Sequence, residues 1–596
     1  MNDGPAGIEL PRSADPAAGN HPLFGSDLLA ETIRALGVEW IALNPGASFR
    51  GLHDSLVNHL GNRDPQMLLC LHEEHAVAIA HGYAKVAGRP MAAVAHSNVG
   101  LMHASMAVFN AFCDRVPLLL LGATGPVDAA RRRPWIDWIH TSRDQGALLR
   151  SFLKWDDQPA SVPAAVEALL RGMRIATTAP CGPVYVNLDA AIQEDPLPAG
   201  TPALPPVARF APPVAPAPDP AALAIALAAL RAARAPVMTV GRVSRDPADW
   251  ARRVALAEAL RLRVVTDMKV GAGFPTDHPL HAGEPGMFPG EEALAAMRDA
   301  DCVLDLDGVD LAGIFKACGR VPPVVVRASL DHQVHNGWSF DHQGLPPADH
   351  FFAVPPDRLV AALLDAIDGA AAPADLPPLP APPEAGDPEE APSIPALAAA
   401  LRRATTGRAV TLMRLPLGWS GGLWPFRHPL DYLGYDGGGG IGSGPGMAVG
   451  AALALRGSGR LPVAVLGDGD TLMGLTALWT AARYRIPLLV VVSNNRSFFN
   501  DEVHQERVAR ERGRPVENKW IGQAIRDPDP DLAALARGLG VAGFGPAETM
   551  GALDGALRAA VAVVEGGMPA LVDARVLPGY APSMARAMTR GGGEKD

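Results

Sequence analysis

The sequence predicts an α/β protein of three domains, each with a parallel sheet covered by helices. Three observations carry this prediction. A chain of 596 residues is too long for one hydrophobic core, because single cores stop growing beyond about 250–300 residues. Two Pro/Ala-rich stretches, residues 195–220 and 371–392, divide the chain and have the composition of extended linkers. Between them, short apolar runs alternate with helical patterns, as in parallel sheets with helices on both faces.

The apolar runs are rich in Val, Ile and Leu and end at Gly, Pro, Asp or Asn, which is typical of buried strands. The predicted strands are 39–46, 91–97, 116–123 and 182–189 in the first block, 235–242, 262–268, 301–308 and 322–330 in the second, and 409–415, 461–469, 486–495 and 569–576 in the third. Helical patterns cover 75–88, 101–114 and 475–485. In open parallel sheets, ligands bind at the carboxyl ends of the strands. The loops that follow the apolar runs are therefore the ones that inform about function.

The predicted boundaries follow from these blocks and linkers. They are a flexible N-terminal tail (1–22), a first domain (23–195), a Pro-rich linker (196–214), a central domain (215–370), a Pro/Ala-rich linker (371–392), a third domain (393–585) and a C-terminal tail (586–596).

Composition limits the function classes. The net charge of −11 argues against a nucleic-acid partner, since phosphate contacts need clustered Lys and Arg. No uninterrupted apolar run reaches about 18 residues, so we expect no membrane partner. The N-terminus lacks the apolar segment of a signal peptide. The five cysteines are scattered without a CxxC pair, which predicts reduced thiols in the cytoplasm and no zinc cluster.

Two strand ends in the third block carry the clearest chemistry. The strand at 461–466 runs into Gly467-Asp468-Gly469-Asp470, and the next strand ends at Asn494-Asn495. Backbone N–H groups at a helix start favour an anion such as phosphate. Oxygens of Asp468 and Asn495, with one main-chain carbonyl, suit Mg²⁺ held against phosphate. Either half alone is typical of an ordinary turn or strand-end cap; the pair at neighbouring strand ends is more specific.

This Gly-Asp-Gly … Asn-Asn arrangement resembles the motif of thiamine diphosphate (ThDP)-dependent enzymes. The resemblance implies that Asp468, Asn495 and the backbone carbonyl of Ser497 bind Mg²⁺. It further implies cofactor contacts from the remaining motif residues, Gly467, Gly469 and Asp470. One departure is Arg496, where many relatives have Gly; a side chain there can alter the loop without removing the ligands.

A second match lies in the first domain. The stretch "LHEEHAVAIAHGYAKVAG" resembles the family's His-Glu pair followed by an Ala-rich helix, and aligns Glu73 with the glutamate that bonds the aminopyrimidine ring. A carboxylate there favours the imino tautomer, which deprotonates C2 of the thiazolium. The alternative is that Glu73 and Glu74 merely favour a helix start. Zinc is disfavoured because His72 and His75 are three residues apart, whereas HExxH needs four.

Further cofactor contacts are implied by looser matches. In "YDGGGGIGSGPGMAVGAALA", Ile441 occupies the place of the apolar residue that wedges the bent cofactor, and Gly439 would offer its carbonyl to the exocyclic amine. The alternative for Ile441 is a plain core position. Gly418 and Ser420 roughly match a loop that contacts the diphosphate.

The domain order resembles the acetolactate synthase / benzoylformate decarboxylase (2-oxo acid decarboxylase-like) branch. This implies a pyrimidine-binding (PYR) domain, a central domain and a diphosphate-binding (PP) domain. It also implies a cofactor between the PYR domain of one subunit and the PP domain of its neighbour, hence a homodimer or homotetramer. The central block has no GxGxxG after a strand, so the sequence makes no case for FAD; FAD held by loop contacts stays open.

Substrate-facing residues follow from the same resemblance. His96, in "AHSNVG", matches a histidine that faces the substrate in benzoylformate decarboxylases, and suits proton transfer; its alternative is a histidine bonded inside a strand end. His278 matches a histidine on a central-domain loop. Ala47 stands where these decarboxylases have a catalytic serine, although Ser48 is adjacent, and Ala123 stands where the synthases have Gln.

The stretch 131–140 is unusual. We expect the three consecutive arginines, Arg131, Arg132 and Arg133, to be a solvated surface run. Trp135, Trp138 and His140 could instead line a substrate entrance, because large aromatics offer apolar area with a polar tip.

Together these features predict a ThDP- and Mg²⁺-dependent decarboxylase or lyase of a small-molecule 2-oxo acid, acting through an enamine that is protonated or ligated to a second carbonyl. The first alternative is an acetolactate synthase-like carboligase that makes 2-hydroxyketones. The second is a catalytically silent ThDP-binding regulatory relative, which Ala47, Ala123 and Arg496 motivate and Glu73 argues against. The sequence leaves open the acid, the acceptor and the pathway.

Overall fold

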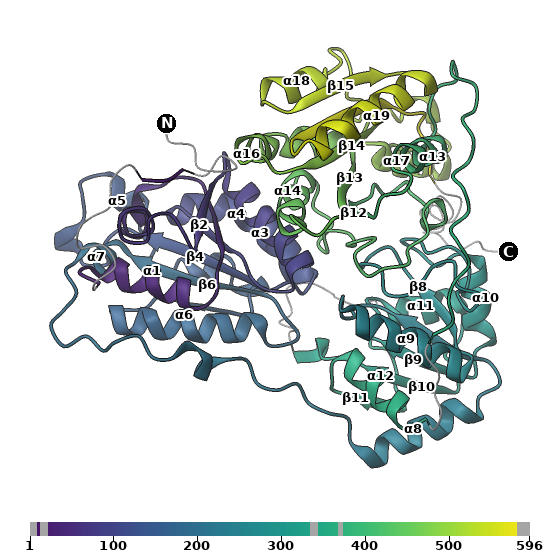
Figure 1. Cartoon of the computed structure of the whole chain (residues 1–596), viewed down its shortest axis with the longest axis horizontal. Helices are drawn as coiled ribbons and strands as arrows, with labels where there is room; N and C mark the ends of the chain where they lie inside the picture. The colour runs from purple at the N-terminus through teal and green to yellow at the C-terminus, as the bar shows by residue number, and fades with distance from the viewer. Residues whose placement is uncertain (1–8, 12–21, 334–343, 368–372, 581–596) are drawn as a thin grey trace.

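The computed structural model describes residues 9–11, 22–333, 344–367 and 373–580. Each of three successive parts of the chain forms a parallel sheet with helices around it. In Figure 1 the first part lies at the left in purple to blue, the second at the lower right in teal, and the third above it in green to yellow. The predicted α/β fold class is confirmed.

The first domain holds a six-stranded parallel sheet in the order β2-β1-β3-β4-β6-β5. Its strands are β1 (Trp40–Leu43), β2 (Gln66–Leu69), β3 (Ala92–Ala95), β4 (Leu118–Thr124), β5 (Trp155–Asp157) and β6 (Pro183–Asp189). Its helices are α1 (Gly25–Ala35), α2 (Arg50–Asp54), α3 (Glu73–Ala87), α4 (Ser97–Cys113), α5 (Ile136–Ile139), α6 (Val162–Thr177) and α7 (Ala190–Glu194). The four predicted strands are present, and the edge strands β2 and β5 were not predicted.

The central domain has a five-stranded parallel sheet in the order β11-β10-β9-β7-β8. Its strands are β7 (Pro236–Val240), β8 (Arg263–Thr266), β9 (Cys302–Leu306), β10 (Val324–Ala328) and β11 (His350–Phe352). Its helices are α8 (Pro220–Ala232), α9 (Pro247–Leu260), α10 (Glu291–Asp299), α11 (Leu311–Cys318) and α12 (Pro356–Asp365). Strands β7, β9 and β10 are buried along nearly their whole length, as a sheet covered on both faces requires.

The third domain repeats the plan with the strand order β12-β13-β14-β16-β15. Its strands are β12 (Val410–Arg414), β13 (Leu461–Gly467), β14 (Leu488–Asn494), β15 (Ala542–Ala547) and β16 (Pro569–Arg575). Its helices are α13 (Ile394–Ala404), α14 (Gly444–Ala454), α15 (Asp468–Gly474), α16 (Ala477–Arg483), α17 (Phe499–Glu511), α18 (Leu532–Gly538) and α19 (Met550–Glu565).

Helices α3 and α14 join the first and third domains, and Figure 1 shows them side by side. Glycines make the approach close: a Cβ on Gly82 would lie 2.0 Å from the carbonyl oxygen of Met447, and one on Gly450 would lie 1.8 Å from that of Ile79. Only a residue without a Cβ fits at such a crossing. The junction therefore places the N-terminal end of α3 beside the glycine-rich loop that precedes α14.

Polar contacts secure the same junction at the sheet edge. The backbone N–H of Leu69 in β2 donates to the hydroxyl of Tyr484 over 2.9 Å, and its carbonyl accepts from the hydroxyl of Thr480, also over 2.9 Å. The central domain meets the first through a buried ion pair between Arg115 and Asp331, with nitrogen–oxygen distances of 2.5 and 3.1 Å.

The linkers are mostly extended. Residues 195–220 contain one short 3₁₀ helix, Val207–Phe210, and are largely exposed. In the predicted N-terminal tail, Glu9 is described, and its carbonyl accepts from the side chain of Asn62; most of that tail and the whole of 586–596 lie outside the described residues.

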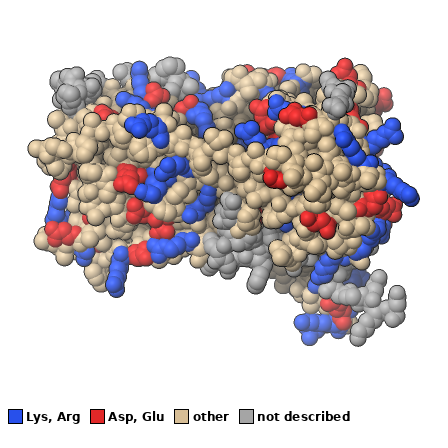
Figure 2. Space-filling model, turned by 90° about the horizontal axis from the view of Figure 1, so that it is seen from below, with Lys and Arg blue, Asp and Glu red and all other residues tan. Residues whose placement is uncertain are grey.

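On the face drawn in Figure 2, basic and acidic side chains are interspersed. Within the described ranges, no helix is both long and apolar enough to cross a bilayer.

Candidate active site

The two motif loops of the third domain lie side by side. Strands β13 and β14 are parallel neighbours, and their register pairs Gly467 with Ser493. Asp468 and Asn495 therefore leave the sheet at the same edge, as predicted. One detail differs from the prediction: helix α15 begins at Asp468. Asp468, Gly469 and Asp470 therefore form the first turn of the helix and not a loop before it.

The carboxylate of Asp468 is buried without a cationic partner in the described part of the chain. Its oxygens accept from the backbone N–H groups of Gly469 (2.9 Å) and Ser497 (3.1 Å). The side-chain oxygen of Asn495 accepts from the same Ser497 N–H over 3.0 Å, so the two oxygen donors converge. Burial raises the pKa of Asp468 to about 6, which marks an anion short of compensating positive charge. Carboxylate and amide oxygens that converge in this way fit Mg²⁺.

Arg496, between Asn495 and Ser497, has a backbone conformation that favours glycine. Its φ is +59°, in the left-handed region that glycine adopts at no steric cost. The backbone N–H of Arg496 donates to the side chain of Asn494 over 3.1 Å, and its guanidinium reaches Asp529 at 3.3 Å. The substitution thus keeps the loop conformation, and its side chain points to an exposed ion pair.

Asp470 holds the glycine-rich loop. Its carboxylate accepts from the backbone N–H groups of Gly442 (2.7 Å) and Gly444 (3.2 Å). Ile441, directly before Gly442, is 37% exposed, so it is not a plain core residue. Gly439, predicted to offer its carbonyl, has a φ of +74° and donates its N–H to Asp436 over 2.8 Å.

Arg414, at the end of β12, is a component that the sequence analysis missed. Its buried guanidinium donates to Asp436 over 2.7 Å and to Asp470 over 3.2 Å, and lies 4.1 Å from the ring centroid of Tyr435. One cation thereby fixes both carboxylates that support the glycine-rich loop. A charged residue at a buried strand end was the available signal.

Gly418 and Ser420 lie elsewhere. They line a cavity of about 640 Å³ between the central and third domains. The hydroxyl of Ser420 donates to Glu284 over 2.7 Å. The structure gives neither residue a contact with Asp468 or Asn495, so their role toward a diphosphate stays a prediction.

Glu73 occupies the first turn of α3 and is buried. His103, on the neighbouring helix α4, approaches one of its oxygens with Nδ1 at 3.1 Å. The first-turn position agrees with the helix-start alternative as well, so position alone does not separate the two roles. His103 was not predicted, because only the packing of α3 on α4 brings it to Glu73.

His72 also lies in this group. Its ring stacks on that of His103 with centroids 4.8 Å apart and an angle of 19° between the planes. The metal-binding atoms of His72, Glu73 and His103 lie within 4.8 Å of one another. Imidazole lone pairs lie in the ring planes, and two stacked, nearly parallel planes do not meet at one ion between them, so this trio is a poor tetrahedral zinc site.

Glu74 links the first domain to the glycine-rich loop. It lies 3.3 Å from the hydroxyl of Ser443, and burial raises its pKa. Glu73 and Glu74 therefore both lie at the end of α3 that faces the glycine-rich loop of the third domain. The third domain also holds Asp468.

His96 precedes α4, with its ring beside the loop that follows β1. Its Nδ1 lies 2.8 Å from the hydroxyl of Ser48, and its ring meets that of His140 edge-on with centroids 5.0 Å apart. Burial, followed by the charges of His140 and Arg133, lowers the pKa of His96, against an opposing effect of Glu73. Nδ1 is thus bonded at the strand end, and the role of His96 toward a substrate stays a prediction.

His278 does not share the contacts of Glu73 or His96. Its Nε2 lies 3.1 Å from Glu258 and its Nδ1 accepts from the N–H of Leu280. Both partners belong to the central domain. The predicted catalytic role of His278 therefore stays a prediction that its contacts do not support.

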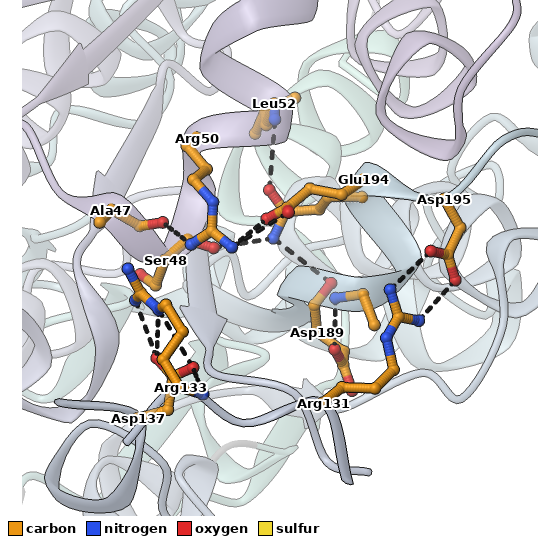
Figure 3. Close-up of polar contacts among 12 residues, drawn as sticks. Ala47, Ser48, Arg50, Leu52, Arg131, Arg133, Asp137, Asp189, Glu194 and Asp195 are labelled. Atoms are coloured by element: carbon orange, nitrogen blue, oxygen red, sulfur yellow. Dashed lines mark hydrogen bonds and ion pairs between the residues drawn. The ribbon is translucent and has the colours of Figure 1, made fainter. Parts of the chain in front are cut away.

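The three arginines at 131–133 are exposed, as expected, yet each is engaged. Arg131 forms a bidentate pair with Asp195 at 2.7 Å, and Arg133 pairs with Asp137 at 2.8 Å; Figure 3 shows both. Arg132 donates to two backbone carbonyls. These contacts fasten the loop that carries the exposed Trp135 and Trp138.

The same loop is tied to the start of α4. The hydroxyl of Ser97 donates to the carbonyl of His140 over 2.5 Å, and the side chain of Asn98 donates to that of Ile139 over 3.1 Å. His140 is thereby held beside His96. These contacts place the loop next to His96. Its role in lining a substrate entrance stays a prediction.

Three family models match the chain. They are the N-terminal TPP binding domain of thiamine pyrophosphate enzymes (residues 24–148), their central domain (223–311) and their C-terminal TPP binding domain (417–574).

Individual relatives and a solved structure agree with these models. A benzoylformate decarboxylase of Pseudomonas aeruginosa is 28% identical over 525 residues, covering 84% of this chain and 90% of the relative. A probable acetolactate synthase of Oryza sativa is 26% identical over 548 residues, covering 87% of this chain and 78% of the relative. The structure of a thiamine diphosphate-dependent 4-hydroxybenzoylformate decarboxylase of Rhodococcus jostii aligns with a TM-score of 0.73 at 22% identity, over 94% of this chain and all of that one; at this identity it shows a shared fold.

Proposed function

Because the chain belongs to the thiamine pyrophosphate enzyme family and carries its three domains in order, we propose that it is a ThDP- and Mg²⁺-dependent enzyme that decarboxylates a 2-oxo acid. The observation that carries the proposal is the buried carboxylate of Asp468, which lacks a cationic partner among the described residues and converges with the oxygen of Asn495 on one N–H group. Burying such a charge is costly unless a cation joins it.

These residues would hold Mg²⁺, with the carbonyl of Ser497 as a third oxygen ligand. The first turn of α15 would hold the diphosphate, since the N–H groups at a helix start favour anions. The loop fixed by Arg414 through Asp436 and Asp470 would hold the aminopyrimidine, with Ile441 presenting an uncovered apolar side chain to it.

When bound, ThDP supplies a nucleophilic carbon and an electron sink, which together permit loss of CO₂ from a 2-oxo acid. The chain supplies the proton handling. Glu73 would share a proton with a ring nitrogen of the cofactor, held in place by the first turn of α3 and by His103. His96 would hold a proton beside the substrate, because Nδ1 is engaged with Ser48 and Nε2 has no partner among the described residues.

A carboligase that joins two carbonyl compounds into a 2-hydroxyketone is the second candidate. The similarity to acetolactate synthases favours it, as does Ala47 in place of the serine of benzoylformate decarboxylases. A silent regulatory role is less favoured, because Glu73 and the Asp468–Asn495 pair are both in place.

We further infer that the enzyme is a homo-oligomer with sites shared between subunits. Within one chain, no contact between described residues joins Glu73 to Asp468. Apolar side chains on both domains are uncovered near these groups: Val99 and Met102 on α4, and Ile441 and Met473 around the glycine-rich loop. A second copy that covers them would bring the two halves together. The five free cysteines support a reducing compartment.

The test of the proposed activity is a panel of aliphatic and aromatic 2-oxo acids, incubated with ThDP and Mg²⁺ and scored for CO₂, aldehyde and hydroxyketone. We expect CO₂ release from at least one acid, dependent on both additions. The Asp468→Asn variant should lose Mg²⁺-dependent ThDP binding in calorimetry, because Mg²⁺ loses its only carboxylate ligand. Glu565→Gln, which changes an exposed acid at the end of α19, is the control. Turnover without ThDP, or full ThDP binding by Asp468→Asn, would contradict the proposal.

A further inference from the structure

The loop after β1 makes an unusual double contact with His96. The hydroxyl of Ser48 lies 2.8 Å from Nδ1, and the backbone N–H of the same residue points at the same nitrogen over 3.4 Å. A backbone N–H can only donate. Nδ1 must therefore accept, and in a neutral imidazole the proton then lies on Nε2.

The hydroxyl reinforces this choice. The Ser48 hydroxyl can rotate so that it donates to Nδ1 over 2.8 Å. The backbone N–H of Ser48 disfavours the opposite arrangement, in which a protonated Nδ1 donates to the hydroxyl, because two N–H groups would then face each other. Nε2 meets no protein group among the described residues, so its N–H is available to a ligand. The ring is half-buried at the start of α4, and its plane is perpendicular to that of His140.

Hydrogen bonds from neighbouring side chains fix the position of Ser48. Ser48 is 5% exposed. Its carbonyl accepts from the fully buried side chain of Gln193 over 3.1 Å. Arg50 donates to the carbonyl of Ala47 over 2.8 Å and pairs with Glu194; Figure 3 shows this contact beside Ser48. The hydroxyl is thus carried on a braced turn rather than on a free loop.

His96 also packs directly against the backbone of the same turn. A Cβ on Gly46 would lie 2.3 Å from the Cβ of His96, so the backbone of this loop touches the histidine directly. The charged groups that face the ring are His140 and Arg133 from the loop after β4 and Glu73 from the start of α3. Burial and the first two favour the neutral ring, and Glu73 opposes them.

We propose that Ser48 is a positioning residue that holds the ring of His96 in the tautomer with its proton on Nε2, directed as a hydrogen-bond donor to an oxygen of the 2-oxo acid. A donor placed where charge develops on that oxygen lowers the barrier without transferring its proton. Ser48 thereby compensates for Ala47, acting through His96 rather than on the substrate. The substrate-directed part of this inference rests on the proposed function; the orientation of the ring does not.

The orientation is tested without substrate or cofactor. Diethyl pyrocarbonate attacks a nitrogen lone pair, and in this tautomer the lone pair on Nδ1 is covered by Ser48. The rate of modification of His96 is followed by peptide mass spectrometry across pH 5–8 in the full-length protein. We expect wild-type His96 to react slowly, with a midpoint below the ordinary histidine pKa.

In Ser48→Ala the plateau rate of His96 should rise several-fold, because Nδ1 loses the hydroxyl that covers it and keeps only the longer backbone contact. The midpoint should move up by about half a pH unit, because a bond that favours the neutral ring is lost. Ser48→Thr, which keeps the hydroxyl, should behave as the wild type. Ser105→Ala removes an exposed hydroxyl of α4 and is the matched control. If Ser48→Ala fails to fold, Ser48→Gly answers the same question.

Unchanged rate and midpoint in a folded Ser48→Ala or Ser48→Gly variant would overturn the proposal. A substrate arm separates it from the proposed function: with a 2-oxo acid that the enzyme decarboxylates, Ser48→Ala should lower kcat by about tenfold while KM stays within about twofold, and Ser48→Thr should restore kcat. An altered KM with normal kcat would contradict the role at the substrate. If no acid is decarboxylated, the proposed function fails while the ring-orientation result stands.

Discussion

His75 sets a limit on the acid stability of this protein. It is buried at the junction of the first and third domains, where its Nε2 lies 2.8 Å from the hydroxyl of Thr476. Burial, with a smaller effect of His72, lowers its pKa to about 4. Its Nδ1 is buried without a partner in the described part of the chain, so protonation there has no compensating acceptor.

The direction of the pH effect follows from linkage. In the unfolded chain His75 takes up a proton near pH 6.5, whereas the folded protein takes it up only near pH 4. Stability is therefore complete above pH 6.5 and is lost as pH falls toward 4, by roughly 3 kcal/mol from this residue. We predict that His75→Gln weakens the fall of the urea-unfolding midpoint between pH 7 and pH 4.5. The same fall in both proteins would show that His75 does not set this limit.

Individual site residues differ in how far the sequence reveals them. Asp468 and Asn495 could be predicted, because strand ends of a parallel sheet are ligand positions whatever the rest of the fold. Ser48 and His103 could not be assigned roles, since each acts through a partner that only tertiary packing supplies. Arg414 was missed because it lies inside the predicted strand 409–415, and its carboxylate partners come from later parts of the chain.

At the level of elements, the crossing of α3 and α14 controls the geometry of the site. It holds the end of α3 that carries Glu73 against the loop before α14. The crossing depends on glycine, since a Cβ on Gly82 would lie 2.0 Å from the carbonyl oxygen of Met447. Backbone atoms on both sides leave no flexible group to move aside.

We predict that Gly82→Ala lowers the thermal unfolding midpoint by several degrees, corresponding to a cost of about 1–3 kcal/mol from overpacking. The matched control is Gly555→Ala in α19, where a Cβ would meet nothing within 4 Å. That change should leave the midpoint unchanged or raise it slightly, because alanine favours a helix over glycine. Equal effects of the two substitutions would contradict the close crossing.

The strands show where sequence reading works and where it stops. The long buried strands β4, β6, β13, β14 and β16 were predicted, because continuous Val, Ile and Leu runs are specific for a sheet covered on both faces. The edge strands β2, β5, β11 and β15 were missed. They are short or only partly buried, and β15 contains glycine and proline, so their pairing partners rather than their own residues make them strands.

For the whole molecule, the arrangement separates the two halves of the chemistry. The first domain holds Glu73 and His96, and the third holds Asp468 and Asn495. Contacts within one chain bring Glu74, but not Glu73, to the glycine-rich loop. A site completed by a second copy accounts for this separation and for the uncovered apolar side chains on both domains.

Mixing two inactive variants tests this account most directly. Glu73→Gln lacks the acid and Asp468→Asn lacks the metal ligand, so neither homo-oligomer should accelerate exchange of the C2 proton of ThDP in deuterated water. Unfolded and refolded together, mixed oligomers contain one site that draws an intact Glu73 from one chain and an intact Asp468 from the other. We predict that the mixture regains a substantial fraction of the wild-type exchange rate measured by NMR. Exchange by Glu73→Gln alone, or no recovery in a mixture shown to contain both chains, would contradict it.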